Sequence, residues 1–326
     1  EIARIYGYDN IPSASLEGNA TAGVKTDKQK FIDNVKSNSI ACGLNEILTY
    51  SFVSPRGVDK INLPADDEKR NFVKIMNPLG EETSVMRTTL IPNMLDVIST
   101  NISHKVEEVS AFECGNTFIP QEGLPIETKK YCVGMYGKEV DFFVLKGVIE
   151  SVLNNVGLKG YEIEPETTNL TFHPGRCAKI VYNNIYIGNF GELHPDVIEN
   201  YNLGQRVYVA EINIDTVFEN LNLTKSYNPL PKYPSTSRDI ALIVKDEVFV
   251  KQIEDIIKAN GEDLVESYKL FDVYKGAQIE EGHKSIAYSI TYRSKDKTLT
   301  DEDVAKVHEK ILSELSEKLN ANLRSN

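Results

Sequence analysis

The chain has few cysteines and no long apolar segment. Its four cysteines, Cys42, Cys114, Cys132 and Cys177, are scattered, and no two of them form a Cys-x-x-Cys pair. Scattered cysteines are typical of reduced thiols, so the sequence predicts neither a zinc knuckle nor a disulfide framework. The apolar runs fall far short of the roughly 20 residues that cross a bilayer, and no signal peptide is visible. We therefore expect a cytoplasmic protein with no membrane partner.

Positive charge is also scarce. Lysine and arginine together number 36 against 48 aspartates and glutamates, which gives a formal net charge of -12. This balance disfavours a protein that coats nucleic acid by charge alone, although one domain could still carry a local basic face. The sequence also contains no P-loop and no dinucleotide fingerprint. Its 326 residues, 41% of them hydrophobic and 26% charged, are enough for two globular domains with real cores.

Two segments have the composition of linkers. Residues 11–26 are rich in Ser, Ala, Gly and Asn, and residues 229–234 hold three prolines. Segments of this composition do not form part of a helix or a strand. We therefore divide the chain into the end of an upstream domain with a linker (1–25), a first domain (26–228) and a second domain (229–326). Because the chain begins at Glu1 and not at a methionine, we expect a C-terminal fragment of a longer protein.

The first domain mixes helices and strands without regular alternation. Apolar spacing of three and four residues predicts helices at 27–40, 92–104 and 142–156. Alternating or β-branched runs predict strands at 48–53, 73–76, 109–118, 178–182, 185–190 and 207–214. Asn183 and Asn184 are a hairpin signal between two of these strands. Since the order is not that of a doubly wound fold, we expect an α+β domain with a largely antiparallel sheet.

The second domain follows the order strand, helix, strand, strand, helix, strand. The strands are expected at 238–244, 265–274, 284–293 and 322–324, and the first helix at 250–259. Thr300 begins the last helix, with Asp303 at the capping-box position. This βαββαβ order is ferredoxin-like.

The second strand of the second domain carries the leading RNA-binding candidates. Strand alternation puts Asp272 and Tyr274 on one face and Phe271 and Val273 on the other. With Phe271 and Val273 buried against the helices, Asp272 and Tyr274 would face solvent. Unpaired RNA bases stack on exposed aromatic rings, so Tyr274 is a candidate stacking platform and Asp272 a base-edge acceptor. Arg324, on the short final strand, is a candidate phosphate or base contact.

Nearby basic residues form a second set of RNA-binding candidates. They are Lys275, Lys284, Arg293, Lys295 and Lys297. Each could supply positive charge to phosphates, and each could equally be a solvated residue on a generic sheet. This domain is near neutral to slightly acidic by its count of charges, so we expect any RNA contact to be local.

Several short motifs follow one another in an order typical of one family. They are Ala3 to Pro12, Asn77-Pro78-Leu79, Met86 to Pro92, Phe112 to Gly115, His173 to Arg176 and Gly191 to Pro195. Together with Phe271 to Tyr274 and Lys297 to Asp301, they make the whole chain resemble the C-terminal part of the β subunit of bacterial phenylalanyl-tRNA synthetases.

The resemblance implies two domains with different roles. The first would be a class II aminoacyl-tRNA synthetase-like domain that is catalytically inactive, and the second a ferredoxin-like anticodon-binding domain. The family works as a heterotetramer of two α and two β chains. Its α subunit joins ATP and phenylalanine before transfer to tRNA(Phe), so ATP and magnesium are expected in the holoenzyme and not on this fragment. Glu1 matches the last of the acidic residues that hold a magnesium ion in the family, which makes it a partial metal site; the proofreading regions would lie upstream.

The first domain lacks the arginines that class II synthetases use to hold ATP. One of these belongs to a Phe-Arg-x-Glu strand and the other to a glycine-rich motif, because guanidinium groups suit phosphates and adenine. Here no arginine flanks Ser110-Ala111-Phe112-Glu113, and no Gly-x-Gly-x-x-Arg follows. We therefore expect no catalytic residue in this chain.

Two polar features of the first domain have alternative interpretations. The first is a cluster of His173, Arg176, Glu192 and His194. It could bind zinc or serve acid–base chemistry, but its spacing is no known ligand pattern. The alternative is a structural cluster at strand ends or a subunit interface, with tight turns at Pro174 and Pro195 fixed by side-chain hydrogen bonds. The second feature is Arg87, for which we favour a structural or interface ion pair over a substrate contact.

These observations give one leading hypothesis and two alternatives. The leading one is a β-subunit part that supports the ATP-dependent attachment of phenylalanine to tRNA(Phe) by docking the α subunit and binding the anticodon region. The alternatives are a structural or interaction protein that does not bind RNA, and a free-standing class II adenylating enzyme. The missing ATP arginines disfavour the last.

Overall fold

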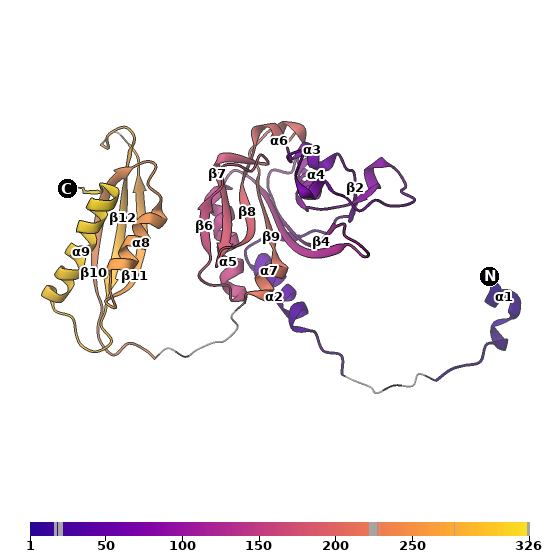
Figure 1. Cartoon of the computed structure of the whole chain (residues 1–326), viewed down its shortest axis with the longest axis horizontal. Helices are drawn as coiled ribbons and strands as arrows, with labels where there is room; N and C mark the ends of the chain where they lie inside the picture. The colour runs from indigo at the N-terminus through magenta and orange to yellow at the C-terminus, as the bar shows by residue number, and fades with distance from the viewer. Residues whose placement is uncertain (16–17, 19–21, 222–226, 228, 277, 325–326) are drawn as a thin grey trace. The chain divides into compact units, whose positions relative to one another are not determined.

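The chain folds as two compact units, Glu1–Thr224 and Lys225–Asn326, in a computed structural model (Figure 1). The structure describes residues 1–15, 18, 22–221, 227, 229–276 and 278–324. Part of the expected linker 11–26 therefore lies outside the described residues, as does Asn228 at the expected end of the first domain. No described helix is both long enough and apolar enough to cross a bilayer.

The first unit is built on a sheet that has seven strands within the described residues. In spatial order they are β1 (Asn45–Glu46), β4 (Val109–Ile119), β5 (Ile126–Tyr136), β9 (Tyr208–Asn213), β8 (Ile185–Leu193), β7 (Phe172–Tyr182) and β6 (Glu162–Pro165). All neighbours pair antiparallel except β1 and β4, which are parallel. The expected α+β domain with a largely antiparallel sheet is thus confirmed.

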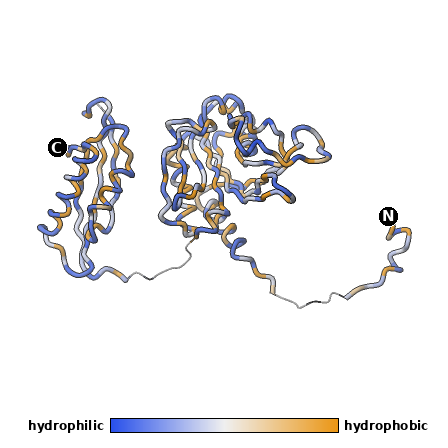
Figure 2. The backbone as a smooth tube through the Cα atoms, in the orientation of Figure 1, coloured by the Kyte–Doolittle hydropathy of each residue, from blue (hydrophilic) through white to orange (hydrophobic). Residues whose placement is uncertain are grey.

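Both faces of this sheet are covered by helices. The first core contains residues of α2 (Asp27–Ala41), α5 (Phe142–Val156) and α7 (Ile214–Glu219), and the second contains residues of α3 (Gly57–Lys60), α4 (Ile91–Ser103) and α6 (Pro195–Asn200). On β5, Tyr131 and Val133 belong to the first core, whereas Cys132 between them belongs to the second. Hydrophobic residues recur along the strands and helices of this unit (Figure 2). Polar groups on either face therefore lie inside the protein.

Local capping explains why several elements lie where the sequence predicts them. In α5, the Asp141 side chain accepts a hydrogen bond from the Val144 N–H, and Gly157 ends the helix in the left-handed region at φ 100°. Asn183 and Asn184 both have positive φ, at 49° and 64°, as a two-residue hairpin turn between β7 and β8 requires. The predicted helix at 142–156 and the predicted hairpin turn at Asn183 and Asn184 are both confirmed.

Two expected strands of the first unit are wrong. Only Phe52–Val53 of the expected strand 48–53 pairs, as β2, with β3 (Val85–Met86). Residues 73–76 form no strand, because their ladder with β3 is a single bridge between Lys74 and Val85. Strand β5 was not expected, since its first half contains Lys129 and Lys130 and so lacks apolar alternation. Pairing with β4 along its full length creates it.

The first unit has four further short elements, two at its N-terminal end and two between α3 and β3. They are α1 (Ile2–Tyr6) and the 3-10 helices η1 (Tyr8–Asn10), η2 (Glu68–Arg70) and η3 (Glu81–Thr83).

The second unit is a four-stranded antiparallel sheet with two helices within its described residues. The spatial order is β11 (Val265–Tyr274), β12 (His283–Tyr292), β10 (Thr236–Lys245) and β13 (Asn322–Leu323), and the helices are α8 (Val250–Asn260) and α9 (Asp301–Leu319). Thr300 caps α9 in a capping box with Asp303, as expected. The ferredoxin-like order is confirmed.

The two faces of this second sheet differ. Ile286, Tyr288, Ile290 and Tyr292 of β12 join the core with residues of α8 and α9. The residues between them, Ser285, Ala287, Ser289 and Thr291, point to the opposite side because side chains alternate along a strand. We call the side that carries these four small residues the open face, since the apolar core formed by the described residues lies on the other side.

Candidate nucleic-acid interface

Asp272 and Tyr274 lie on the open face of the second unit. In the register between β11 and β12, Asp272 is opposite Ala287 and Tyr274 is opposite Ser285. Residues directly opposite each other in an antiparallel pair share a face. Asp272 is exposed and Tyr274 is half-buried, so both side chains are accessible from the face opposite to the core that α8 and α9 form.

The expectation that Phe271 and Val273 are buried against the helices is wrong. Their exposed fractions are 54% and 52%. A register shift between Leu270 and Asp272 leaves Phe271 in a β-bulge, where the alternation of side chains is interrupted. Val273 does lie opposite the core residue Ile286, but β11 is an edge strand, and no described strand pairs with its outer side.

Arg324 contacts Tyr274 across the open face. Its guanidinium carbon lies 5.6 Å from the centroid of the Tyr274 ring, a cation–π geometry. The two residues come from opposite edges of the sheet, because Tyr274 ends β11 and Arg324 follows β13. The Arg324 backbone N–H donates to the Ala241 carbonyl at 2.9 Å. The three residues singled out in the sequence therefore share one face.

Two of the basic candidates are fixed beside the loop that follows β11. The Lys275 ammonium forms an ion pair with the Asp246 carboxylate at 2.7 Å. The Lys284 ammonium donates to the Asp246 carbonyl at 2.8 Å, and burial lowers the pKa of Lys284. Through these contacts with Asp246, both lysines stabilise the loop between β11 and β12, whether or not they also bind phosphate.

The other basic candidates differ in how freely they can reach RNA. Arg293 pairs with Glu266 at 2.9 Å and donates to the Tyr233 carbonyl at 2.6 Å, so it anchors the chain that enters β10. Lys297 forms an ion pair with a carboxylate in the first turn of α9 at 2.8 Å. Lys295 is exposed. Exposed ion pairs are weak and can exchange partners, which leaves Lys295 and Lys297 accessible to phosphate.

Arg87 in the first unit is fully engaged inside the protein. Its Nη1 lies 2.9 Å from the Glu113 carboxylate, and the two side chains are 4% and 2% exposed. It also donates to the Thr49 hydroxyl at 2.7 Å and to the Asn116 carbonyl at 2.9 Å. A Cβ on Gly115 would come within 2.3 Å of Arg87 Nη2, so only glycine leaves room for this ion pair. The geometry is that of a structural ion pair.

The structure pairs Arg176 with Glu192, whereas His173 and His194 each contact the backbone of their own turn. Arg176 binds the Glu192 carboxylate through two hydrogen bonds of 2.6 and 2.8 Å. The Nδ1 atom of each histidine accepts a backbone N–H two residues further on, at 3.1 and 3.2 Å. The predicted side-chain hydrogen bonds in these turns are thus confirmed. Within the described residues, no group of three histidine, cysteine or acidic side chains is arranged to hold a metal ion.

Glu1 is exposed and pairs with Arg4 of α1 at 2.7 Å. Mg²⁺ demands several oxygen ligands in octahedral geometry, and a single exposed carboxylate beside an arginine does not make such a site. Glu1 by itself therefore does not form a magnesium site in this structure.

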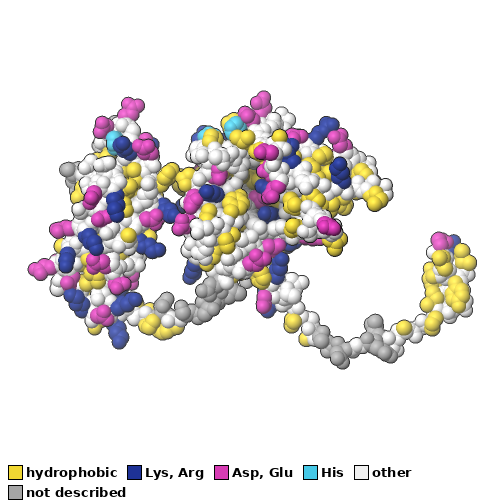
Figure 3. Space-filling view, in the orientation of Figure 1, with side chains coloured by type: hydrophobic (Ala, Val, Ile, Leu, Met, Phe, Trp, Pro, Cys, Tyr) yellow, Lys and Arg dark blue, Asp and Glu magenta, His cyan; other side chains and the backbone are white. Residues whose placement is uncertain are grey.

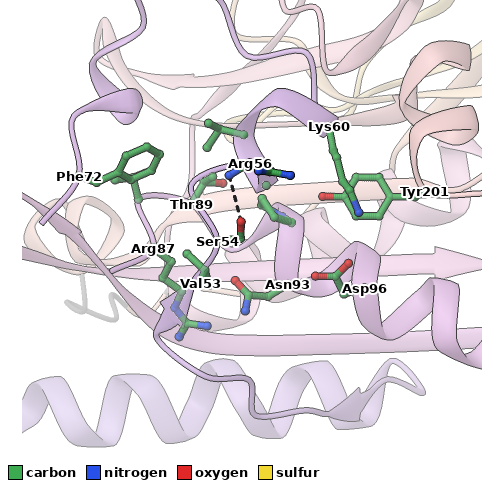
Figure 4. A pocket seen from close by; sticks show the side chains of 14 residues that line it. Val53, Ser54, Arg56, Lys60, Phe72, Arg87, Thr89, Asn93, Asp96 and Tyr201 are labelled. Atoms are coloured by element: carbon green, nitrogen blue, oxygen red, sulfur yellow. Dashed lines mark hydrogen bonds between the residues drawn. The ribbon is translucent and has the colours of Figure 1, made fainter. Parts of the chain in front are cut away.

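A cavity of about 240 Å³ lies in the first unit between α3, α4 and the segment around Phe72 (Figure 4). Tyr201 forms one wall and is 3% exposed, with the Lys60 ammonium 4.9 Å from its ring centroid. Its hydroxyl has no hydrogen-bond partner among the described residues, and burial raises the pKa of this phenol. Sequence reasoning missed this cavity because its walls come from segments that are far apart in the chain.

The cavity does not provide the charges of an ATP site. Two arginines line it, but Arg56 pairs with Glu81 at 3.0 Å and Arg87 with Glu113 at 2.9 Å. Both guanidinium groups are therefore matched by carboxylates of the protein, and neither is held ready for a phosphate.

Comparison with known proteins defines the class of each unit. Residues 231–324 match the model of the ferredoxin-fold anticodon binding domain. Residues 11–214 match the model of the phenylalanyl tRNA synthetase beta chain CLM domain. The chain therefore belongs to the family of phenylalanyl-tRNA synthetase beta chains.

Curated relatives agree with this assignment. The phenylalanine–tRNA ligase beta subunits of Clostridium tetani and Clostridium acetobutylicum are 47% and 45% identical over 327 residues, which is 99% of this chain and 41% of each relative. That of Moorella thermoacetica is 37% identical over 336 residues, covering 99% of this chain and 42% of the relative. The chain thus spans about two fifths of these relatives. A pyrrolysyl tRNA synthetase structure from Desulfitobacterium hafniense aligns with a TM-score of 0.49 at 12% identity, over 59% of this chain and 66% of that one.

Proposed function

We propose that this chain is the part of a phenylalanine–tRNA ligase β subunit that holds the anticodon region of tRNA(Phe) and docks the catalytic α subunit. In an enzyme of two α and two β chains, the α subunit attaches phenylalanine with ATP and magnesium, in the cytoplasm. This chain supplies no catalytic residue. The observation that carries the proposal is the meeting of Asp272, Tyr274 and Arg324 on the open face of an anticodon-binding fold.

The chemistry of these three side chains suits an unpaired RNA loop. The Tyr274 ring offers a π-face to a base, the Asp272 carboxylate accepts a hydrogen bond from a base edge, and the Arg324 guanidinium binds a phosphate or stacks on a base. Ser285 and Ala287, which lie opposite them on β12, are buried, so a base would meet the Tyr274 and Arg324 side chains and not β12 itself. Recognition here depends on stacking and hydrogen bonds, which agrees with the net charge of -12.

The first unit serves as a docking body in this proposal. Its polar groups Arg87, Glu113 and Glu192 are paired within the unit. Apolar side chains are instead exposed at the end that carries β2, where hydrophobic atoms gather on the surface (Figure 3). Exposed apolar residues in the segments that precede β2 and β3 include Leu48, Tyr50, Met76 and Leu79. An exposed apolar surface of this kind is typical of a subunit interface, and we propose that it contacts the α subunit.

Binding of tRNA positions the substrate in this mechanism. When the second unit holds the anticodon end, the acceptor end loses much of its freedom to diffuse. The reaction on the α subunit then gains from reduced entropy, without any chemical group from the β chain.

Filter binding of tRNA(Phe) to the 326-residue chain tests the proposal. Tyr274→Ala is expected to weaken binding by about 1–3 kcal/mol, the worth of one base stacked on an aromatic ring. Tyr50→Ala, which removes an exposed tyrosine of the first unit, is the matched control and should bind like the unsubstituted chain.

Three results would contradict the proposal. Equal binding by the Tyr274→Ala variant and the unsubstituted chain would remove Tyr274 from the RNA site. A folded unsubstituted chain that binds no tRNA(Phe) would instead favour an interaction protein. ATP–pyrophosphate exchange by the chain alone would revive the free-standing adenylating enzyme.

A further inference from the structure

We infer that Gln278 and Gly276, in the loop between β11 and β12, are positioning residues that hold Arg324 and Tyr274 in place for RNA. The inference rests on the proposed function, because it concerns how the same open face is arranged. Neither residue carries a sequence motif, and neither lies on a strand. Their role follows from their contacts with the Tyr274–Arg324 pair.

Gln278 restrains the Arg324 side chain. The Arg324 Nη2 donates a hydrogen bond to the Gln278 Oε1 at 2.9 Å. An arginine side chain has large rotamer entropy, and Arg324 is the last residue that the structure describes, beyond an exposed two-residue strand. Without the Gln278 acceptor, only the cation–π contact with Tyr274 would hold the guanidinium across the sheet.

Gly276 sets the position of the Tyr274 ring. A Cβ at residue 276 would lie 2.3 Å from the Tyr274 hydroxyl oxygen and 2.6 Å from its Cζ atom. The backbone of Gly276 is not in the left-handed region, so conformational freedom does not explain the glycine. Space for the tip of the tyrosine ring explains it.

The loop that presents these two residues is fastened at both ends. Lys275 pairs with the Asp246 carboxylate at 2.7 Å, and Lys284 donates to the Asp246 carbonyl at 2.8 Å. Between them, the Ile279 N–H donates to the Gly276 carbonyl at 2.9 Å. Gln278 is therefore presented from an anchored turn, and its hydrogen bond fixes Arg324 relative to the sheet.

The spacing of the pair determines how RNA can meet it. A base between the two groups would need about 7 Å, twice the roughly 3.5 Å contact distance of carbon atoms. The observed 5.6 Å is too short. The guanidinium therefore covers one face of the ring, and a base meets Tyr274 and Arg324 together, as one platform. Arginine planes and aromatic rings both serve as stacking surfaces for RNA bases.

Gln278→Met in the 326-residue chain tests this inference, since methionine has a similar length but no oxygen acceptor. Affinity for tRNA(Phe) should fall about threefold to tenfold, the effect of having to order one long side chain on binding. Gln121→Met is the matched control, because Gln121 is an exposed residue in the loop between β4 and β5 of the first unit. Gly276→Ala should also weaken binding, with the thermal unfolding midpoint unchanged for all three variants.

A double-mutant cycle separates positioning from a general effect on the loop. In an Arg324→Met background, Gln278→Met should cause no further loss, because the side chain that it positions is gone. The same loss in both backgrounds, or wild-type affinity of Gln278→Met alone, would overturn the inference while leaving the proposed function intact. Failure of the folded, unsubstituted chain to bind tRNA(Phe) would overturn both.

Discussion

The two sheets of this chain differ in how many of their faces are covered. The sheet of the first unit has an apolar core on each side, so that neighbouring residues of β5 enter different cores. The sheet of the second unit has its core on one side, and β12 places small residues on the other. A covered sheet can use its polar side chains only to support the fold, whereas an open face can offer them to a partner.

Two arginines show this difference most clearly. Arg87 is buried, and its donors are used by Glu113, Thr49 and the Asn116 carbonyl. Arg324 is half-buried at a sheet edge, over Tyr274 and against one glutamine. The same side chain thus stabilises the fold in the first unit and, in our proposal, binds RNA in the second.

The largest expected effect is the loss of the buried ion pair. Arg87→Met should lower the free energy of unfolding of the first unit by about 3–5 kcal/mol, because Glu113 is left buried without its partner. Affinity for tRNA(Phe) should not change in conditions where the variant is folded. Urea unfolding followed by circular dichroism measures the stability.

Arg206→Met provides the control for this prediction. Arg206 is exposed and lies 3.8 Å from the Glu192 carboxylate, so its loss should cost less than about 1 kcal/mol. Equal destabilisation by the two substitutions would contradict the claim that burial makes Arg87 structural.

The reverse pattern is expected for Arg324→Met. Affinity for tRNA(Phe) should fall by about 1.5–3 kcal/mol, the worth of a hydrogen bond with a charged group. Stability should change by no more than about 1 kcal/mol, since an exposed cation–π contact contributes little. Filter binding and urea unfolding of the same preparation give both numbers, and a large loss of stability would make the two arginines alike.

A smaller effect concerns the acid sensitivity of the first unit. Burial alone would raise the pKa of Glu192, but the hydrogen bonds and charge of Arg176, with Arg206 nearby, outweigh it and lower the pKa from its ordinary 4.5. A lowered folded-state pKa gives stability that is complete above the ordinary value and is lost as pH falls through the folded pKa.

Glu192→Gln should therefore lower the free energy of unfolding by about 1 kcal/mol at neutral pH. The loss is this small because solvent screens the partly exposed Arg176. Its deficit relative to the unsubstituted chain should shrink as the pH falls below 4.5 and the wild-type carboxylate gains its proton. Urea midpoints across this range measure the trend. Glu164→Gln, at an exposed ion pair with Lys179, is the control, and a pH-independent deficit for Glu192→Gln would refute the assignment.

Elements with local signals were predictable from the sequence. The apolar spacing of the helix at 142–156, the paired asparagines at 183 and 184 and the capping box at Thr300 each act over a short stretch of chain. Elements that depend on partners were not. Strand β5 exists because β4 and β9 pair with it, and the segment 48–53 forms so little strand because β3 is only two residues long.

The candidate site was predictable only in part, for the same reason. Alternation along β11 was enough to assign Asp272 and Tyr274 to one face, but not to locate the bulge that exposes Phe271. Gln278 and Gly276 have no recognisable pattern, because their contacts with Arg324 and Tyr274 depend on the fold of the loop.

The most direct test of the open face as the RNA site uses the absence of tryptophan from the chain. Tyr274→Trp keeps a stacking ring and makes it the unique tryptophan, and Phe271→Trp places the same probe in the bulge of the same strand. We predict that tRNA(Phe) quenches the fluorescence of Tyr274→Trp in a saturable way and changes that of Phe271→Trp much less. Equal quenching of both probes, or a response of Phe271→Trp alone, would contradict the account.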